Sequence, residues 1–177
     1  MNRLLFASAH VDRIAAEASL PAKFKRLLDK ANLKARFEGQ RVAVKMHVGG
    51  GIGYYTIHPL FVRLLVEALK EADARPFLVD GSFSTDAAVG RGYTPEVVGC
   101  RVVGAGGEFD RYVYTRPTPI PGLPEVEVCG NVVDADGMLV FSHGKGHGCT
   151  GYGGAIKNIA MGCVSCKTRG AIHGLLG

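Results

Sequence analysis

No hydrophobic run in this sequence approaches the roughly 20 residues that a membrane-spanning helix requires. Every apolar stretch is broken by a charged residue, a glycine or a proline within a few positions. The opening residues, MNRLLFASA, place an arginine before an apolar run, but that run is too short for a secretory signal peptide. We therefore expect a cytoplasmic protein with no membrane partner.

Acidic residues are absent from residues 137–177, whereas the same segment carries Lys145, Lys157, Lys167 and Arg169. Most of the formal net charge of +5 therefore belongs to this part of the chain. A positive segment rich in glycine amides favours an anionic small molecule or an anionic metal cluster as partner. Nucleic acid is not expected, because the basic residues are sparse and are not interleaved with aromatic ones.

Cysteines are few, and their number is odd. They stand at positions 100, 129, 149, 163 and 166, a pattern that suits reduced thiols or metal ligands better than disulfide pairs. Hydrophobic residues make up 47% of the chain and charged residues 21%, as in an ordinary globular protein. A length of 177 residues is about that of one domain, so we expect a single packed domain over residues 1–177.

The order of the expected elements indicates an α/β fold. An amphipathic helix at 21–32 precedes an alternating strand at 41–48, in which Lys45 and His47 share one face. The glycine-rich segment GGGIGYYTIH then leads into a helix that begins at Pro59, and a strand follows at 77–79. Strand, loop, helix and strand form a βαβ unit, which joins parallel strands. We expect a mainly parallel sheet with flanking helices.

The expected elements further along the chain are shorter. Residues 81–96 are expected to form a polar loop, with a strand-like run at 97–103, and the segment TRPTPIPGLP is expected to be an extended arm. Strands are expected at 125–128 and 138–141, with a helical turn at 131–135 between them. A helix rich in small residues is expected over 153–161, with Gly162 as its end.

Residues suited to catalysis stand at the ends of three of the expected strands. They are Lys45 and His47 with the following glycine-rich loop, Asp80 with Ser82, and the segment from Ser142 to Lys145. Ligands of open α/β sheets bind beyond the carboxyl ends of the strands, so we expect these residues to gather at one edge. The candidate catalytic residues are His47, Asp80, Lys145 and His147, with the histidines suited to proton transfer near neutral pH. Alternatively, Asp80 caps a helix and His47 is a core residue.

The glycine-rich run after residue 145 has the spacing of a dinucleotide-binding motif. Gly146, Gly148 and Gly151 match that spacing, but no acidic residue follows, so a nicotinamide site is not expected. Backbone amides at the start of the next helix instead favour a phosphate or a carboxylate. The expected cofactor-binding residues are Gly146, Gly148, Gly151, Gly153, Gly154 and Lys157. Alternatively, the glycines only let a strand and a helix pack closely.

Soft and borderline metal ligands are concentrated in the same region. Zinc accepts imidazole and thiolate, whereas iron-sulfur clusters prefer thiolate. The candidate metal ligands are His143, His147, Cys149, Cys163 and Cys166. Alternatively, Cys163 and Cys166 are small packing residues after a helix, and Cys149 is a nucleophile activated by a neighbouring histidine. Cys100 and Cys129 are expected to be buried hydrophobic residues.

Three stretches, VKMHVGG, SHGKGHGCTGYGGAIKNIAMGC and the closing GAIH, together resemble the domain-of-unknown-function family 362, whose members are labelled uncharacterised iron-sulfur centre proteins. The resemblance spans nearly the whole chain. It implies a ferredoxin-like four-cysteine segment beyond the region that matches residues 174–177, where this sequence stops. A cluster here would use Cys149, Cys163 and Cys166 with a histidine or an exogenous ligand. The apolar ending AIHGLLG also predicts a homo-oligomer or a partner subunit.

These observations leave three functions open. The clustered ligands and the resemblance favour a redox-linked protein that holds an iron-sulfur cluster or a transition metal. The first alternative is a metal-independent enzyme acting on a phosphorylated or carboxylated small molecule, with Lys45, Lys145 and Lys157 as charge partners. The second alternative is a noncatalytic subunit of an assembly.

Overall fold

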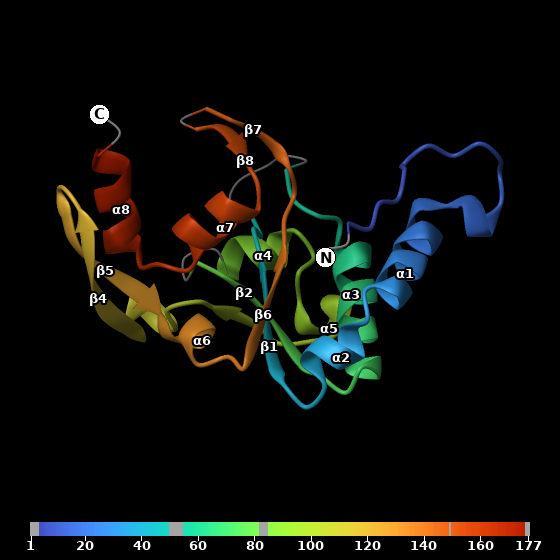
Figure 1. The fold of residues 1–177 in the computed structure, drawn as a ribbon, viewed down its shortest axis with the longest axis horizontal. Coiled ribbons are helices and arrows are strands. Elements are labelled where there is room, and N and C mark those ends of the chain that lie inside the picture. The colour runs from blue at the N-terminus through green and yellow to red at the C-terminus, as the bar shows by residue number, and fades with distance from the viewer. Residues whose placement is uncertain (1–3, 50–54, 82–84, 149, 176–177) are drawn as a thin grey trace.

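The computed structural model describes residues 4–49, 55–81, 85–148 and 150–175 (Figure 1). Its helices and strands, in chain order, are η1 (Ala16–Ala18), α1 (Leu20–Lys30), α2 (Leu33–Phe37), β1 (Arg41–Met46), α3 (Pro59–Glu71), β2 (Arg75–Asp80), α4 (Thr85–Gly90), α5 (Pro95–Val98), β3 (Val102–Gly104), η3 (Glu108–Asp110), β4 (Val113–Ile120), β5 (Leu123–Cys129), α6 (Gly130–Val133), β6 (Gly137–Phe141), β7 (Lys145–His147), β8 (Gly151–Gly153), α7 (Ala155–Gly162) and α8 (Cys166–Gly174).

A parallel sheet of four strands forms the centre of the described part of the chain. Its strand order is β3-β2-β1-β6, and each neighbouring pair is parallel. In this register Lys45 of β1 lies between Val79 of β2 and Val140 of β6. The α/β fold expected from the sequence is thereby confirmed, and the carboxyl ends of the strands share one edge.

One face of the sheet carries the larger hydrophobic core. Val42, Val44 and Met46 of β1 are wholly buried there against the apolar side of α3, which includes Leu65 and Leu69. Helices α1, α2, α3 and α5 lie together on this side of the sheet (Figure 1). Full burial of each such aliphatic side chain contributes about 1.5–3 kcal/mol, so this face supplies much of the stability of the fold.

The opposite face of the sheet is smaller and partly polar. Ala43, Phe77 and Val79 pack there with Ala105 and Cys129. Side chains alternate between the faces along a strand, so Lys45, which follows Val44, also belongs to this second face. Helix α7 contacts β1 and β6 on this side and closes over the lysine.

Two sequence expectations between residues 81 and 128 are wrong. Residues 81–96 are not one polar loop, because they contain α4 and the start of α5, whose first residue is Pro95 and whose end is fixed by Gly99 at φ +82°. The expected arm TRPTPIPGLP is part of an antiparallel hairpin formed by β4 and β5. Prolines are tolerated there because a two-stranded sheet consists of edge strands. The strand expected at 125–128 therefore belongs to this hairpin and not to the parallel sheet.

Helix α8 is an element that the sequence analysis did not predict, and it lies along the β4–β5 hairpin (Figure 1). Ser165 caps the helix, since its hydroxyl accepts a hydrogen bond from the Thr168 amide. Glu127 of β5 accepts hydrogen bonds from the Ser165 hydroxyl and from Lys167. An antiparallel bridge between Val128 and Val164 completes the attachment of the last helix to the hairpin.

Within the residues that the structure places, no helix combines the length and the apolar character needed to span a bilayer.

Candidate functional site

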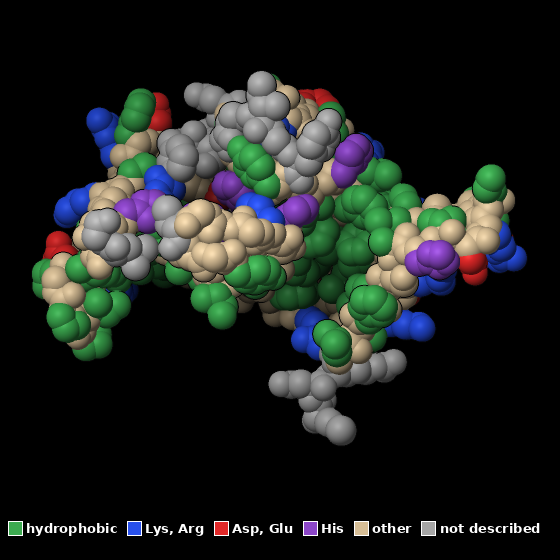
Figure 2. Space-filling view, turned by 90° about the horizontal axis from the view of Figure 1, so that it is seen from above, with side chains coloured by type: hydrophobic (Ala, Val, Ile, Leu, Met, Phe, Trp, Pro, Cys, Tyr) green, Lys and Arg blue, Asp and Glu red, His purple; other side chains and the backbone are tan. Residues whose placement is uncertain are grey.

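Basic side chains gather at the edge of the sheet where the parallel strands end. Figure 2 looks down on this edge and shows histidine side chains beside those of lysine or arginine near the middle of the surface. The hairpin of β7 and β8 and the start of α7 rise from the same edge (Figure 1).

A buried ion pair lies beneath this edge. Lys45 has no exposed surface, and its Nζ donates hydrogen bonds to Asp80 Oδ1 at 2.8 Å and to the carbonyl of Met46 at 2.9 Å. Burying charges is costly unless their remaining hydrogen-bonding capacity is also satisfied. The Lys45 ammonium is satisfied by a third acceptor, Asn158 Oδ1, at 2.5 Å. Lys45 is thus part of the scaffold and does not reach the surface.

Asn158 is a residue that the sequence analysis placed on a helix without giving it a role. Besides accepting from Lys45, its side-chain amide donates to the Lys45 carbonyl at 3.3 Å and to the Ser142 hydroxyl at 2.8 Å. Asn158 belongs to α7, Lys45 to β1, and Ser142 to the segment after β6. One amide therefore fixes the helix against two strand ends.

Asp80 connects the buried pair to the surface through His47. Burial alone would raise the pKa of the Asp80 carboxyl, but the hydrogen bond with His47, the charge of Lys45 and the Val48 amide lower that pKa to about 2. The distance from His47 Nδ1 to Asp80 Oδ2 is 3.5 Å, and 41% of the His47 side chain is exposed. The carboxylate is thus ionised at neutral pH and holds one nitrogen of a histidine that solvent can reach.

Four basic residues, His47, Lys145, His147 and Lys157, form what we name the cationic cluster. Partial burial and then the charge of Lys157 lower the pKa of Lys145, while Asp80 acts in the opposite direction. The pKa of His147 is also lowered. Partial burial has the largest effect, and electrostatic interactions with Lys157, Lys145, His173 and His47 add to it. Lys145 and His147 both belong to β7, and a Cβ on Gly153 would lie 3.8 Å from a side-chain atom of each. The structure thus brings together His47, Asp80, Lys145 and His147, which the sequence analysis named as catalytic candidates.

Tyr55 links two members of the cationic cluster through its ring. The His47 ring is roughly parallel to it, with centroids 6.1 Å apart, and Lys145 Nζ lies 5.9 Å from its centroid. The Arg91 guanidinium lies 5.1 Å from the same centroid. Cations near an aromatic face are attracted by the ring quadrupole, so Tyr55 offsets part of the repulsion between them.

The expected cofactor-binding glycines occupy a hairpin rather than a phosphate loop. Gly146 lies in β7, Gly148 in the connection, and Gly151 and Gly153 in β8, and Gly154 is the N-cap of α7. The open surroundings of Gly146 and Gly148 would admit a Cβ without a clash. Lys157 follows in the first turn of α7. The expected glycines therefore lead to the start of a helix, but they do so through a hairpin, and their role in binding a cofactor stays a prediction.

The candidate metal ligands do not converge in the described part of the chain. Cys149 lies outside the described residues, as does Ser82. Cys163 is buried and Cys166 is exposed, and Nδ1 of His143 is buried without a hydrogen-bond partner among described atoms. No group of three histidine, cysteine or acidic side chains with a metal-binding arrangement occurs among the residues placed by the structure.

Three cysteines nevertheless lie near the start of α8: the Cys129 amide donates a hydrogen bond to the Cys163 carbonyl at 2.8 Å, and Cys166 is the first residue of the helix. Burial is the largest cause that raises the pKa of Cys129 to about 12, and the charges of Asp110, Cys163 and Cys166 raise it further. Burial also raises the pKa of the Cys163 thiol, and burial together with Asp110 raises that of Cys166. Metal ligation requires thiolates, which these environments disfavour. The uncharged thiol is therefore the favoured form of these cysteines. Cys100 and Cys129 are buried, as the sequence analysis predicted.

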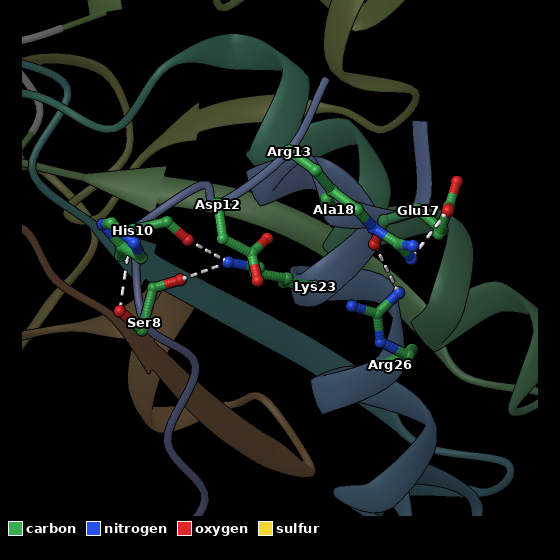
Figure 3. Close-up of a pocket in the computed structure, with 8 residues that line it drawn as sticks. All are labelled: Ser8, His10, Asp12, Arg13, Glu17, Ala18, Lys23 and Arg26. Carbon is green, nitrogen blue, oxygen red and sulfur yellow. Dashed lines mark hydrogen bonds and ion pairs between the residues drawn. The ribbon is translucent and has the colours of Figure 1, made fainter. Parts of the chain in front are cut away.

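A cavity of about 610 Å³ lies beside α1, away from the cationic cluster. Figure 3 shows that its cations point to partners within the N-terminal segment: Lys23 donates to the carbonyls of Ser8 and His10, and Arg13 pairs with Glu17. Arg26 donates to the Glu17 carbonyl. Because these charges already have partners, the cavity is a weaker candidate for an anion than the cationic cluster.

Comparison with known families matches residues 42–176 to the domain of unknown function DUF362. The protein belongs to this family. The matched range includes all of the parallel sheet except Arg41, together with the cationic cluster and α7, so the site described above is part of the DUF362 domain. The comparisons with curated proteins and with solved structures give no match.

Proposed function

We propose that this DUF362 protein binds a phosphorylated or carboxylated small molecule at the cationic cluster and acts on it by proton transfer, with His47 as acid or base. The observation that carries this proposal is the meeting of His47, Lys145, His147 and Lys157 at one edge of the sheet. Repulsion by neighbouring cations contributes to the lowered pKa values of Lys145 and His147. A bound anion relieves that repulsion, which provides the driving force for binding.

The nearby acid does not neutralise this cluster. Asp80 is held by Lys45, by the Val48 amide and by His47, and its charge is balanced first by the buried ammonium. Charge-assisted hydrogen bonds from lysine to phosphate or carboxylate are about twice as strong as neutral ones. Among the described residues no carboxylate forms an ion pair with Lys145 or Lys157, so an anion bound by both would gain two such interactions.

The pairing of Asp80 and His47 is suited to moving a proton. A carboxylate that accepts from Nδ1–H fixes the ring so that Nε2 is the nitrogen that can take up a proton. In the proposed reaction Nε2 accepts a proton from the bound molecule and returns it to the same molecule or to water. His47 is thus the candidate catalytic residue, and Asp80 is a positioning residue.

Calorimetric titration with inorganic phosphate, with and without a chelator, tests the proposal. We expect saturable binding that survives the chelator and weakens about tenfold or more in Lys145→Gln and Lys157→Gln, because a hydrogen bond to a charged group contributes about 1.5–3 kcal/mol. Lys25→Gln, a change at an exposed lysine of α1, is the control and should bind like the wild type. Undetectable binding, or equal binding by all three variants, would contradict the proposal.

A redox-linked protein with an iron-sulfur cluster or a transition metal is the second candidate. It is favoured by the proximity of Cys129, Cys163 and Cys166, together with the resemblance that suggested such a cofactor. Elemental analysis and an absorption spectrum of anaerobically purified protein test it. Stoichiometric iron with visible charge-transfer bands would support this candidate, whereas metal-free protein of normal stability would count against it.

A further inference from the structure

A hollow with apolar walls adjoins the cationic cluster. It has a volume of about 620 Å³ and lies between β8 and the first turn of α7, lined by Thr150, Tyr152, Gly154, Ala155, Ile156 and Lys157. Its two large apolar side chains are strongly exposed, Ile156 at 87% and Tyr152 at 66%. Small-molecule sites have volumes of roughly 300–1,000 Å³ and mostly apolar walls, and this hollow has both properties.

Two glycines leave room for the tyrosine that forms one wall of the hollow. A Cβ on Gly154 would lie 2.6 Å from Cε1 of Tyr152, and a Cβ on Gly144 would lie 2.9 Å from its hydroxyl oxygen. Both positions must therefore be glycine for the Tyr152 ring to lie where it does. The ring packs over the backbone of both glycines and leaves 66% of Tyr152 exposed, so it offers an aromatic surface to a ligand.

Lys157 joins the hollow to the cationic cluster. It lines the hollow beside Ile156, and it lies close enough to Lys145 and His147 to perturb both. An occupant would therefore meet positive charge at one end and apolar side chains at the other. Inorganic anions would use only the first of these features.

We propose that the ligand of this site is an amphipathic organic anion, whose phosphate or carboxylate group is bound by Lys145 and Lys157 and whose apolar group packs between Tyr152 and Ile156. This inference rests on the proposed anion-binding function and adds the class of molecule. The charge beside the apolar walls favours such a ligand over a second copy of the chain, whose own segment 137–177 carries the same positive charge.

Titration with methyl, butyl and hexyl phosphate tests the inference, because these esters share one dianion and differ in apolar length. We expect affinity to rise about twofold or more for each added methylene, up to the roughly fourfold that full burial gives. Ile156→Ser should remove most of this gain and leave the affinity for methyl phosphate unchanged. Ile120→Ser, which alters an exposed isoleucine of β4, should keep the gain.

The outcomes separate this inference from the proposed function. Equal wild-type affinity for the three esters would overturn the amphipathic ligand and leave anion binding intact, whereas no binding of any ester would remove both. Tyr152→Ser provides a second variant with the same expected loss. If sedimentation shows a wild-type dimer that Ile156→Ser dissociates, and the length of the ester has no effect, a second copy covers this face and the inference fails.

Discussion

Helix α7 ends directly on the buried lysine, because Gly162 has no side chain to keep it away from Lys45. A Cβ on Gly162 would lie 2.7 Å from Cε of Lys45 and 2.9 Å from Oδ1 of Asp80. Real Cβ atoms do not approach other atoms so closely in packed proteins. The bare α-carbon therefore lets the last turn of the helix cover the ion pair and exclude water from it.

Replacing this glycine should weaken the fold. We expect Gly162→Ala to lower the free energy of unfolding by about 1–3 kcal/mol, as overpacking a filled interior does. Gly170→Ala in α8 is the matched control, since a Cβ there meets no atom within 4 Å and alanine favours a helix by about 1 kcal/mol. Urea denaturation measures both variants. Equal stability of the two would show that the contact at Gly162 is not tight.

The two charges of the buried pair should depend on each other. Lys45→Met leaves the Asp80 carboxylate without its cation, and removing one partner of a buried pair costs about 3–5 kcal/mol. Adding Asp80→Asn removes the unbalanced charge while retaining an acceptor for the Val48 amide. We therefore expect the double variant to be more stable than Lys45→Met in urea denaturation. Simple additivity of the two single changes would contradict the pairing.

Acid should weaken the protein through Asp80. Its pKa is about 2 in the fold and 3.8 without it, so the unfolded state takes up a proton first as the pH falls. The stabilisation is fully present above pH 3.8 and is lost as the pH falls through about 2, and it amounts to on the order of 2 kcal/mol. Unfolding free energies between pH 2 and 5 should fall less steeply for Asp80→Asn than for the wild type. Parallel curves would refute this role.

Sulfate binding should report the protonation of His147. Burial and the neighbouring groups Lys157, Lys145, His173 and His47 lower its pKa, so the neutral form predominates near pH 7. Sulfate keeps its charge and favours the protonated ring, and its affinity should therefore rise as the pH falls from about 7.5 to 5.5. His147→Gln should flatten this dependence in calorimetric titrations, whereas His10→Gln should not change it. A steep pH dependence that persists in His147→Gln would assign it to another group.

The parallel sheet could be predicted because the apolar pattern of its strands and helices matches the faces that are buried in the fold. The alternation in β1 and the apolar stripe that starts at Pro59 reflect faces that are in fact buried against each other. The hairpin of β7 and β8 gave no such signal, since Lys145–His147 and Gly151–Gly153 contain little apolar pattern and depend on pairing with each other. Helix α8 was missed for a similar reason, because its attachment relies on polar contacts with β5.

The site residues that lie at strand ends, such as His47 and Asp80, could be predicted from the sequence. Gly162 was predicted as the end of its helix, but its contact with Lys45 and the hydrogen bonds of Asn158 were missed, because both depend on what packs against the helix. Their spacing of four did contain a signal, since residues i and i+4 share one side of a helix. When an asparagine and a glycine share one side of an otherwise apolar helix, they indicate that a polar group of another element packs against that side.

Because the chain is synthesised from its N-terminus, the hydrogen bonds of Asn158 with the buried pair can form only late. Lys45 and Asp80 leave the ribosome long before the residues of α7, from which the third acceptor of the ammonium comes. Until that helix has been made, the charged pair lacks its cover and stays accessible to water. A nascent chain can thus align β1 with β2 early, but its polar interior becomes sealed late, when the C-terminal segment arrives.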